Sequence, residues 1–331
     1  MKNSFIIGWL IAWCLLAPGA EPLQPDAVRI VIIPDSQYLS ASGFSAQCAW
    51  IETNRAALNI VAAIHLGDII QDNGSEADWA TKTPGIGLLT NTPFLFCAGN
   101  HDYDTMSHPG SERALTSFNK HLPQSLYTGK SWWHGGFLTN SPGSENSYLL
   151  ISNNGLKLLL FALEFGPRGN VLLWASNICA AYPDYTVIMA THNYLMPTGA
   201  RNSLAKGDGY TPQSYGLTNG CDGEQMWSFV KHIPNLRVIV SGHQDGWPHV
   251  AHSTDVGTKR NRVNQILVDW QLMESGKYGG SDAGANLMIW TLFPSGELGA
   301  ETYGVLTGTF DRSVTNQFRC AARPQRTPSS K

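Results

Sequence analysis

Residues 60–72 read IVAAIHLGDIIQD, an apolar run that stops abruptly at Gly67-Asp68. A short apolar run bounded by a turn signal is typical of a strand that is covered on both faces of a sheet. Four more runs follow the same plan: 28–34 (VRIVIIP), 93–97 (PFLFC), 185–190 (YTVIMA) and 236–240 (LRVIV). We predict that these five runs are strands and that they build the fold.

The segments between these strands have helical spacing, which indicates an α/β architecture. The predicted helices span 46–58, 76–89, 112–122, 171–181 and 224–233. Further strands occur in pairs: SYLLI and LKLLLFALEF flank Asn153-Asn154-Gly155, and NQILVDWQ, NLMIWTLF and ELGAETYG follow His249 without a convincing helix. This order predicts two mixed sheets that pack face to face, with helices on the outside.

Composition excludes several classes of protein. Of the 331 residues, 14% are charged and 43% are apolar, which is unlike a disordered chain or a coiled coil. Lys and Arg total 22 against 25 for Asp and Glu, so the net charge of −3 lacks the basic excess that binding to nucleic acid needs. No internal repeat or linker is visible, which favours one domain over residues 21–331.

The N-terminus has the layout of a secretory signal peptide over residues 1–20. Lys2 precedes an apolar run over 5–17, and Pro18-Gly19-Ala20 follows it. The run is shorter than the roughly 18 to 20 residues that cross a bilayer, although a retained anchor is the alternative. We therefore expect a secreted or periplasmic protein with no transmembrane segment after the signal is removed. The remaining cysteines form no CxxC pair, and no disulfide pairing is predicted.

The residues that follow the five strands carry the chemistry. The strands end in PDSQY (34–38), LGDIIQD (66–72), AGNHD (98–102), THNY (191–194) and SGHQD (241–245). A lone Gly-Asp or a lone His after a strand is usually an ordinary turn. An ordered series of Asp, Asp, Asn, His and His after consecutive strands is different, because strand ends meet at one edge of a sheet.

This series of Asp, Asn and His residues after the strands suits a metal-dependent hydrolase. Asp, Asn and neutral His bind Zn, Mn or Fe, and a shared Asp can bridge two ions. Such a pair lowers the pKa of a trapped water and neutralises the charge of a phosphoryl group, which indicates hydrolysis of a phosphate ester. The motifs HExxH, GxSxG and GxxxxGK[ST] are absent from the sequence.

The order D-x-Q, G-D-x-x-Q-D, G-N-H-D, T-H and G-H over residues 35–245 resembles the calcineurin-like metallophosphoesterase superfamily. The resemblance implies a four-layer α/β/β/α sandwich with a dinuclear metal centre at one edge. It implies that Asp68 bridges both ions and that Asp35 belongs to the first site. Asn100, His192 and His243 would complete the second site.

The resemblance also implies catalytic roles for His101, which would face the substrate and donate to the leaving oxygen, and for Asp102, which would orient the His101 ring. Many members have D-x-H and G-H-x-H, whereas this chain has Gln37 and Asp245 at those second positions. The first site would then be oxygen-rich, favouring Mn, Mg or Ca over Zn, or it would be labile or empty. His249 and His252 are candidates to substitute. The D-x-Q start together with LEFGPR (163–168) resembles a subgroup of secreted bacterial members.

Weaker candidates surround this set. Arg168 and Arg201 are candidates to clamp a phosphate, although ordinary ion pairs are an equal alternative. Tyr38 and Tyr194 flank the expected ligands and are candidates to line the pocket. The loops 103–146 and 196–222 are the expected caps over the site. Their aromatic residues would either stack on a substrate or, as we slightly prefer, pack under the loops: Tyr127, Trp132, Trp133, Tyr210 and Tyr215.

The expected function is hydrolysis of a phosphomonoester or phosphodiester by a metal-activated hydroxide at two divalent ions, with Mn, Fe, Zn, Mg and Ca as candidates. The substrate would be a small-molecule or headgroup phosphate ester, and the oligomeric state is left open. Two alternatives remain: a catalytically silent, metal-containing binding module of the same fold, and a carbohydrate-binding cell-surface protein.

Overall fold

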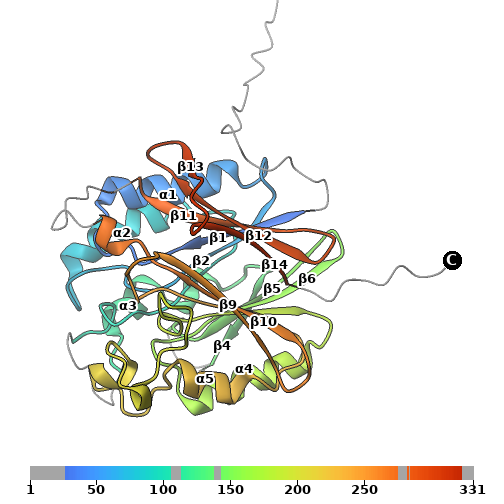
Figure 1. Cartoon of the computed structure of the whole chain (residues 1–331). Helices are drawn as coiled ribbons and strands as arrows, with labels where there is room; N and C mark the ends of the chain where they lie inside the picture. The colour runs from blue at the N-terminus through green and yellow to red at the C-terminus, as the bar shows by residue number, and fades with distance from the viewer. Residues whose placement is uncertain (1–26, 106–112, 138–142, 275–281, 283, 323–331) are drawn as a thin grey trace, which may run out of the picture.

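Two sheets pack face to face in a computed structural model of the chain, which describes residues 27–105, 113–137, 143–274, 282 and 284–322 (Figure 1). The predicted signal peptide over 1–20 lies outside the described residues, as do parts of the expected cap loop 103–146. None of the described helices is both long enough and apolar enough to cross a membrane.

The first sheet has the order β13-β12-β11-β1-β2-β3, and β14 also pairs with β12. Its centre is parallel, because β1, β2 and β3 run in the same direction, and β11 joins β1 in the antiparallel sense. The strands are β1 (Val28–Ile33), β2 (Ile60–His65), β3 (Phe94–Phe96), β11 (Asn286–Leu292), β12 (Glu297–Gly304), β13 (Thr309–Asp311) and β14 (Gln317–Ala321).

The second sheet has the order β4-β5-β6-β7-β8-β10-β9. Its central strands β6, β7, β8 and β10 are parallel, and antiparallel strands flank them on both sides. The strands are β4 (Trp133–Gly136), β5 (Ser147–Asn153), β6 (Leu156–Ala162), β7 (Thr186–Ala190), β8 (Leu236–Ser241), β9 (Val250–Val256) and β10 (Arg262–Val268).

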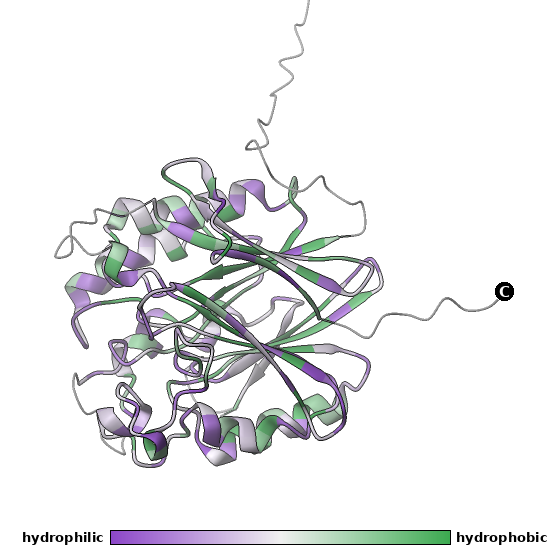
Figure 2. Cartoon of the chain, in the orientation of Figure 1, coloured by the Kyte–Doolittle hydropathy of each residue, from purple (hydrophilic) through white to green (hydrophobic). Residues whose placement is uncertain are grey.

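Burial on both faces explains why the central strands are continuously apolar. Successive side chains of a strand point to opposite faces. In β1, Val28, Ile30 and Ile32 belong to the core between the sheets, while Val31 and Ile33 belong to the core under the helices of the first sheet. Strand β6 divides its side chains in the same way between the central core and the core under the other helices. In Figure 2 much of the ribbon of the two sheets is green, the colour of hydrophobic residues.

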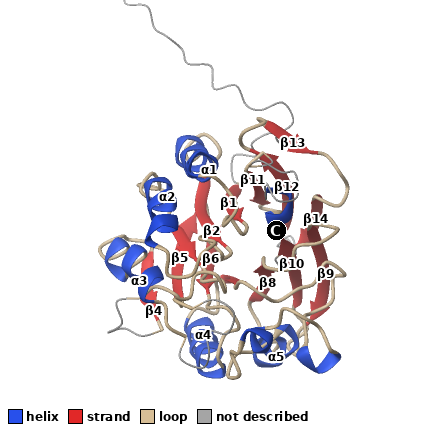
Figure 3. Ribbon diagram, turned by 90° about the vertical axis from the view of Figure 1, so that its left-hand side faces the viewer, coloured by secondary structure: helices blue, strands red, loops and turns tan. Residues whose placement is uncertain are grey.

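Helices cover the outer face of each sheet and complete four layers (Figures 1 and 3). Residues of α1, α2 and α3 share a core with the first sheet, and residues of α4 and α5 share one with the second. The α/β/β/α sandwich is therefore confirmed. The helices are α1 (Ala41–Asn54), α2 (Glu76–Ile86), α3 (Thr116–His121), α4 (Gly169–Ala181), α5 (Gly223–Val230) and the short α6 (Gln271–Glu274), and three 3₁₀ turns span Gln124–Leu126, Leu204–Lys206 and Pro212–Tyr215.

The predicted elements differ from the observed ones mainly at their ends. Helix α1 begins at Ala41 rather than at residue 46, because the Ser40 side chain accepts a hydrogen bond from the Gly43 amide and caps it. Strands β4, β9, β13 and β14 were not predicted, since they are short or only half buried. The five cysteines in the described part of the chain are free.

Candidate metal centre

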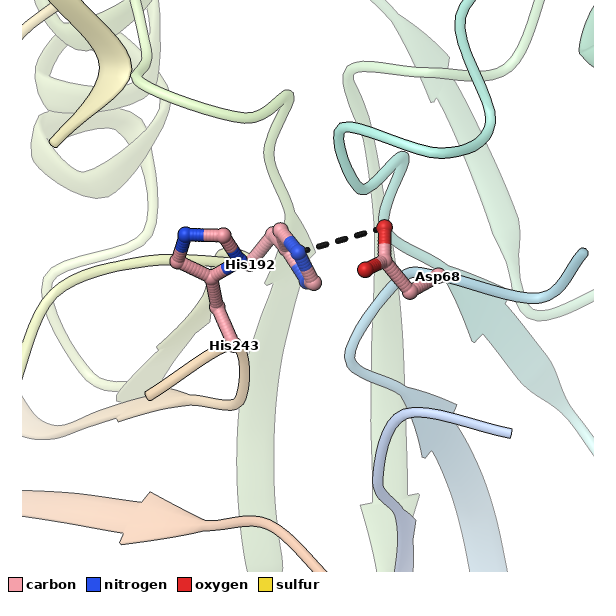
Figure 4. Close-up of side chains that lie close together, drawn as sticks. All are labelled: Asp68, His192 and His243. Atoms are coloured by element: carbon pink, nitrogen blue, oxygen red, sulfur yellow. Dashed lines mark ion pairs between the residues drawn. The ribbon is translucent and has the colours of Figure 1, made fainter. Parts of the chain in front are cut away.

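The carboxyl ends of β1, β2, β3, β7 and β8 meet at one edge of the sandwich. Asp68 follows β2, His192 follows β7 and His243 follows β8. Each of these three buried residues offers a ligand atom, and the three atoms lie within 4.8 Å of one another. Figure 4 shows the His192 ring between the other two side chains. Residues from the two sheets, 175 positions apart along the chain from 68 to 243, thus build one site.

The hydrogen bonds of His192 leave one ring nitrogen for a cation. Its Nδ1 lies 3.0 Å from the Leu66 carbonyl, an acceptor, so the Nδ1–H donates there and Nε2 carries the lone pair. That Nε2 lies 3.0 Å from Asn100 Oδ1 and 3.3 Å from Asp68 Oδ1. Three acceptor atoms from different strands therefore converge, and a divalent metal ion satisfies all of them. The donor set fits the metal that the sequence predicts.

His243 is oriented in the same manner by the loop over the site. Its Nε2 lies 3.0 Å from the Tyr210 carbonyl, which leaves Nδ1 as the ligand nitrogen. Burial, followed by the neighbouring His192, lowers the pKa of His243 to about 3, so the ring is neutral and able to bind a metal. Its backbone has φ +69°, a left-handed conformation that non-glycine residues adopt rarely and mainly at functional sites.

The two ligand carboxylates have opposite electrostatic surroundings. Burial raises the pKa of Asp35 well above its usual range, and Asp269 and then Asp68 raise it further. Both Asp35 oxygens accept a hydrogen bond from the His243 amide, at 3.2 and 3.1 Å. Burial also opposes ionisation of Asp68, but His192 and His101, when they are protonated in the absence of metal, outweigh it, so the pKa of Asp68 lies below its usual range. Of the two carboxylates, Asp68 is thus the one that ionises more readily, as a metal ligand must.

The glycines of the motifs allow the strand ends to approach closely. Gly67 has φ +105°, and a Cβ at this position would lie 2.7 Å from both the Gly99 amide nitrogen and His192 Nδ1. A Cβ at Gly242 would overlap Oδ1 of Asp35. The glycines before Asp68 and His243 are therefore a steric requirement of the centre rather than ordinary turn residues.

His101 and Asp102 have different contacts from those expected. The His101 amide donates to Asp68 Oδ1 at 2.9 Å, and its ring Nε2 lies 4.0 Å from Asp68 Oδ2 with 18% of the side chain exposed. Its Nδ1 contacts the Gln71 carbonyl at 2.6 Å. Asp102 instead accepts the amides of Gly99 and Ile69, at 2.8 and 2.9 Å. The expected role of Asp102 as the residue that orients His101 is therefore wrong, because the Gln71 carbonyl does this.

Gln37 contacts the bridging candidate Asp68, whereas both oxygens of Asp245 contact groups outside the centre. Gln37 Nε2 donates to Asp68 Oδ2 at 3.3 Å. Asp245 Oδ1 lies 2.8 Å from His249 Nδ1, and Asp245 Oδ2 accepts the Leu272 amide. His252 stacks on Phe318 with ring centroids 4.6 Å apart and contacts Asn264 Oδ1. His252 therefore does not replace a missing ligand, and His249 is directed to Asp245.

The two arginines that were predicted to clamp a phosphate each form an ion pair with a carboxylate of the protein. Arg168 binds Glu164 with both ends of its guanidinium, at 2.8 and 3.0 Å. Arg201 binds Glu224 at 2.8 Å and also pairs with Asp255. Each carboxylate occupies the fork that a phosphate would need, so the clamp prediction is corrected for both arginines.

Most of the aromatic candidates pack in the interior. Tyr194 is fully buried and its hydroxyl donates to Gln265 at 2.6 Å, which corrects its prediction as a pocket residue. Tyr127 stacks on Trp133 at 4.4 Å under its loop, as the packing alternative predicted. Tyr215 contacts the centre, with its ring 5.4 Å from that of His243. Tyr38 and Tyr210 are 37% and 66% exposed.

Sequence reasoning missed three contributors to the centre. Phe165 closes one wall, with its ring 5.4 Å from His192 and 5.2 Å from His243, and it comes from the LEFGPR segment. The Tyr210 carbonyl also accepts from Asn193 Nδ2 at 2.6 Å. Asp269 follows β10 and raises the pKa of Asp35. Asp269 could have been found from the sequence, because a sixth apolar run ends at Val268 and this carboxylate follows it, in VDWQ at 268–271.

A two-sheet sandwich whose strand ends join Asp, Asn and His side chains at one edge has the architecture that the motifs predicted. The family model for calcineurin-like phosphoesterases matches residues 28–245. The chain therefore belongs to the calcineurin-like phosphoesterase family, as its motifs predicted.

The chain is similar to several solved structures and to one curated protein. The structure of the purple acid phosphatase PPD1 from yellow lupin seeds superposes with a TM-score of 0.54 at 15% identity, over 92% of this chain and 57% of that one. A dimetal phosphatase from Danio rerio has a TM-score of 0.49 at 11% identity, over 89% and 99% of the two chains. An uncharacterized protein of Bacillus subtilis strain 168, YvnB, is 28% identical over 259 residues, which are 76% of this chain and 18% of YvnB. The chain thus spans less than a fifth of the length of that curated relative.

Proposed function

We propose that this protein hydrolyses phosphate esters with two divalent metal ions held by Asp35, Asp68, Asn100, His192 and His243. The observation that carries the proposal is the convergence of His192 Nε2 with Asn100 Oδ1 and Asp68 Oδ1, at 3.0 and 3.3 Å. Acceptor atoms that face one another in a buried site are costly unless a cation joins them. Family membership supports the reaction class.

The metal ions would supply an activated water and neutralise charge on the phosphoryl group. The residues of the chain position the other reactants. A protonated His101 donates its Nδ1–H to the Gln71 carbonyl and directs its Nε2–H into the centre, 4.0 Å from Asp68 Oδ2. That proton passes to the ester oxygen as its bond to phosphorus breaks, so the product leaves as an alcohol. The phosphate retains the oxygen that came from water.

We propose a small organic phosphate ester as the substrate, because an exposed aromatic ring adjoins the centre. Tyr210, whose carbonyl binds His243, has a ring that is 66% exposed and lies 6.4 Å from the His243 ring. Exposed rings of this kind can stack on an apolar or sugar-bearing leaving group. We also propose that residues 1–20 direct export, which N-terminal sequencing of protein from the periplasm or medium would test through a start after Ala20.

The test compares wild type with His192→Ala and with His232→Ala as a matched control, since His232 is exposed and has no role in the centre. Each protein is loaded with Mn²⁺ or Zn²⁺ and assayed on an aryl phosphate and an aryl phosphodiester. We expect hydrolysis of at least one ester by wild type and by the control, and a loss of about a thousandfold with His192→Ala. Stoichiometric metal in wild type without hydrolysis of either ester would support the silent binding module and overturn the proposal.

A further inference from the structure

Strand β10 delivers a carboxylate to the edge of the sandwich that carries the metal centre. Strands β10 and β8 are parallel, and Leu267 pairs with Ser241. Two residues beyond these partners lie Asp269 and His243, so both follow their strands to the same edge. Asp269 is fully buried, and its Oδ1 accepts the Gln271 amide at 3.0 Å. Its own amide donates to the His249 carbonyl at 2.9 Å, which fixes the backbone there.

Gln37 joins this segment to the bridging carboxylate. Its Nε2 donates to Asp68 Oδ2 at 3.3 Å and also contacts Gln271 Oε1. The Gln37 side chain is 7% exposed, and its Oε1 is buried with no hydrogen-bond partner among the described residues. A buried acceptor without a partner costs about 1–3 kcal/mol. A cation bound between these side chains removes that cost.

Several buried carboxylates gather around Asp35. Asp68, Asp245 and Asp269 lie near enough to Asp35 to act on it electrostatically. Asp35, Asp68 and Asp269 are each no more than 1% exposed. Buried carboxylates gathered at one point are stable only when protons or cations neutralise them.

Asp245, the residue that occupies the usual ligand position, is directed elsewhere. Its two oxygens bind His249 Nδ1 at 2.8 Å and the amide of Leu272. The Leu272 contact holds the turn that contains Asp269 and Gln271. Asp245 therefore has the contacts of a positioning residue.

We propose that Asp269 is a metal ligand, and that the position beside Asp35 is built from side-chain oxygens alone: Asp35, Gln37, Asp68 and Asp269. This inference rests on the proposed function, and it adds a ligand that lies beyond the 28–245 family match. An all-oxygen position favours Mn²⁺, Mg²⁺ or Ca²⁺, while the His192 and His243 position accepts Zn²⁺ as well. Asp245 positions the Asp269 turn.

The first test measures metal content and affinity in the full chain, by elemental analysis and calorimetric titration with Mn²⁺. Wild type is compared with Asp269→Asn and with Asp184→Asn as a control, since Asp184 is exposed before β7 at the opposite end of the second sheet. We expect two Mn²⁺ per chain in wild type and in the control. In Asp269→Asn the affinity of one site should fall at least about tenfold. Two sites with unchanged affinities in Asp269→Asn would overturn the assignment.

A second measurement on wild type removes any dependence on the folding of the variant. In crystals grown with Mn²⁺, anomalous scattering locates the ions. An Asp269 oxygen within bonding distance of the peak beside Asp35 supports the assignment, and a peak that Asp269 does not contact overturns it.

If wild type binds neither Mn²⁺ nor Zn²⁺, the proposed function itself fails. If wild type binds two ions and hydrolyses an ester while Asp269→Asn binds Mn²⁺ normally, only the role of Asp269 is wrong.

Discussion

The substitution Gly67→Ala tests whether close packing of the strand ends builds the metal centre. The added Cβ would lie 2.7 Å from the Gly99 nitrogen and from His192 Nδ1, against 3.4 Å for ordinary contact, so its neighbours must retreat by about 0.7 Å. Both are held: the Gly99 amide donates to Asp102 at 2.8 Å, and His192 Nδ1 lies 3.0 Å from the Leu66 carbonyl. We expect the free energy of unfolding to fall by about 2–4 kcal/mol, as the sum of backbone strain at φ +105° and overpacking.

The matched control is Gly207→Ala. Gly207 has φ +82° but nothing within 4 Å of an added Cβ, so it carries the backbone strain without the overlap. We expect about 1 kcal/mol of destabilisation in this control and unchanged metal binding. Urea denaturation followed by tryptophan fluorescence measures stability, and calorimetric titration with Mn²⁺ measures the affinity, which should fall at least about tenfold only in Gly67→Ala. Equal stability and equal Mn²⁺ affinity in the two variants would refute the steric explanation.

Three further predictions concern other parts of the molecule. His101→Ala should lower kcat by about 10²- to 10⁴-fold with two metal ions still bound, and elemental analysis showing lost metal would contradict its role as the acid. Glu164→Gln should cost about 3 kcal/mol in urea unfolding because it leaves Arg113 and Arg168 without their buried carboxylate, and an unchanged midpoint would disprove this. Burial opposes ionisation of Glu52, but hydrogen bonds from Asn91, Thr92 and Thr90 outweigh it and lower its pKa. The folded-state pKa therefore lies below the unfolded value, so Glu52 stabilises the fold above about pH 4 and the benefit disappears as pH falls through the folded-state pKa. Glu52→Gln should lose about 1 kcal/mol at pH 7 and progressively less as the pH falls toward the folded-state pKa, and a pH-independent difference would contradict the linkage.

The candidate ligands could be predicted from the sequence because the end of a strand is visible in a few neighbouring residues, and the ends of parallel strands meet in the fold. An apolar run that stops at a polar residue marks the end of a buried strand, and parallel strands place their carboxyl ends at one edge. Asp68, His192 and His243 could therefore be grouped without knowing the order of the strands. The same logic applied to the run ending at Asp269, but that run follows the antiparallel strand β9, so its direction was not evident from the sequence.

Residue type did not reveal which side chains face inward. Arg168 and Arg201 could equally bind a phosphate or a carboxylate, and the fold brings Glu164 and Glu224 to them. Asp102 adjoins His101 in the chain, but its carboxylate turns toward the backbone amides of Gly99 and Ile69. Adjacent residues in a turn point in different directions, so contacts between them do not follow from their order.

The sequence by itself determined the family, the two-sheet architecture and the residue types that bind metal, because apolar runs and the motifs after them are local patterns. Only the tertiary structure decided that the Gln71 carbonyl orients His101, that Phe165 walls the centre and that Asp269 lies near Asp35. These contacts join segments that are 27 to 234 residues apart, or they involve backbone atoms that every residue carries. No local pattern encodes such pairs, since they depend on how the strands are ordered and packed.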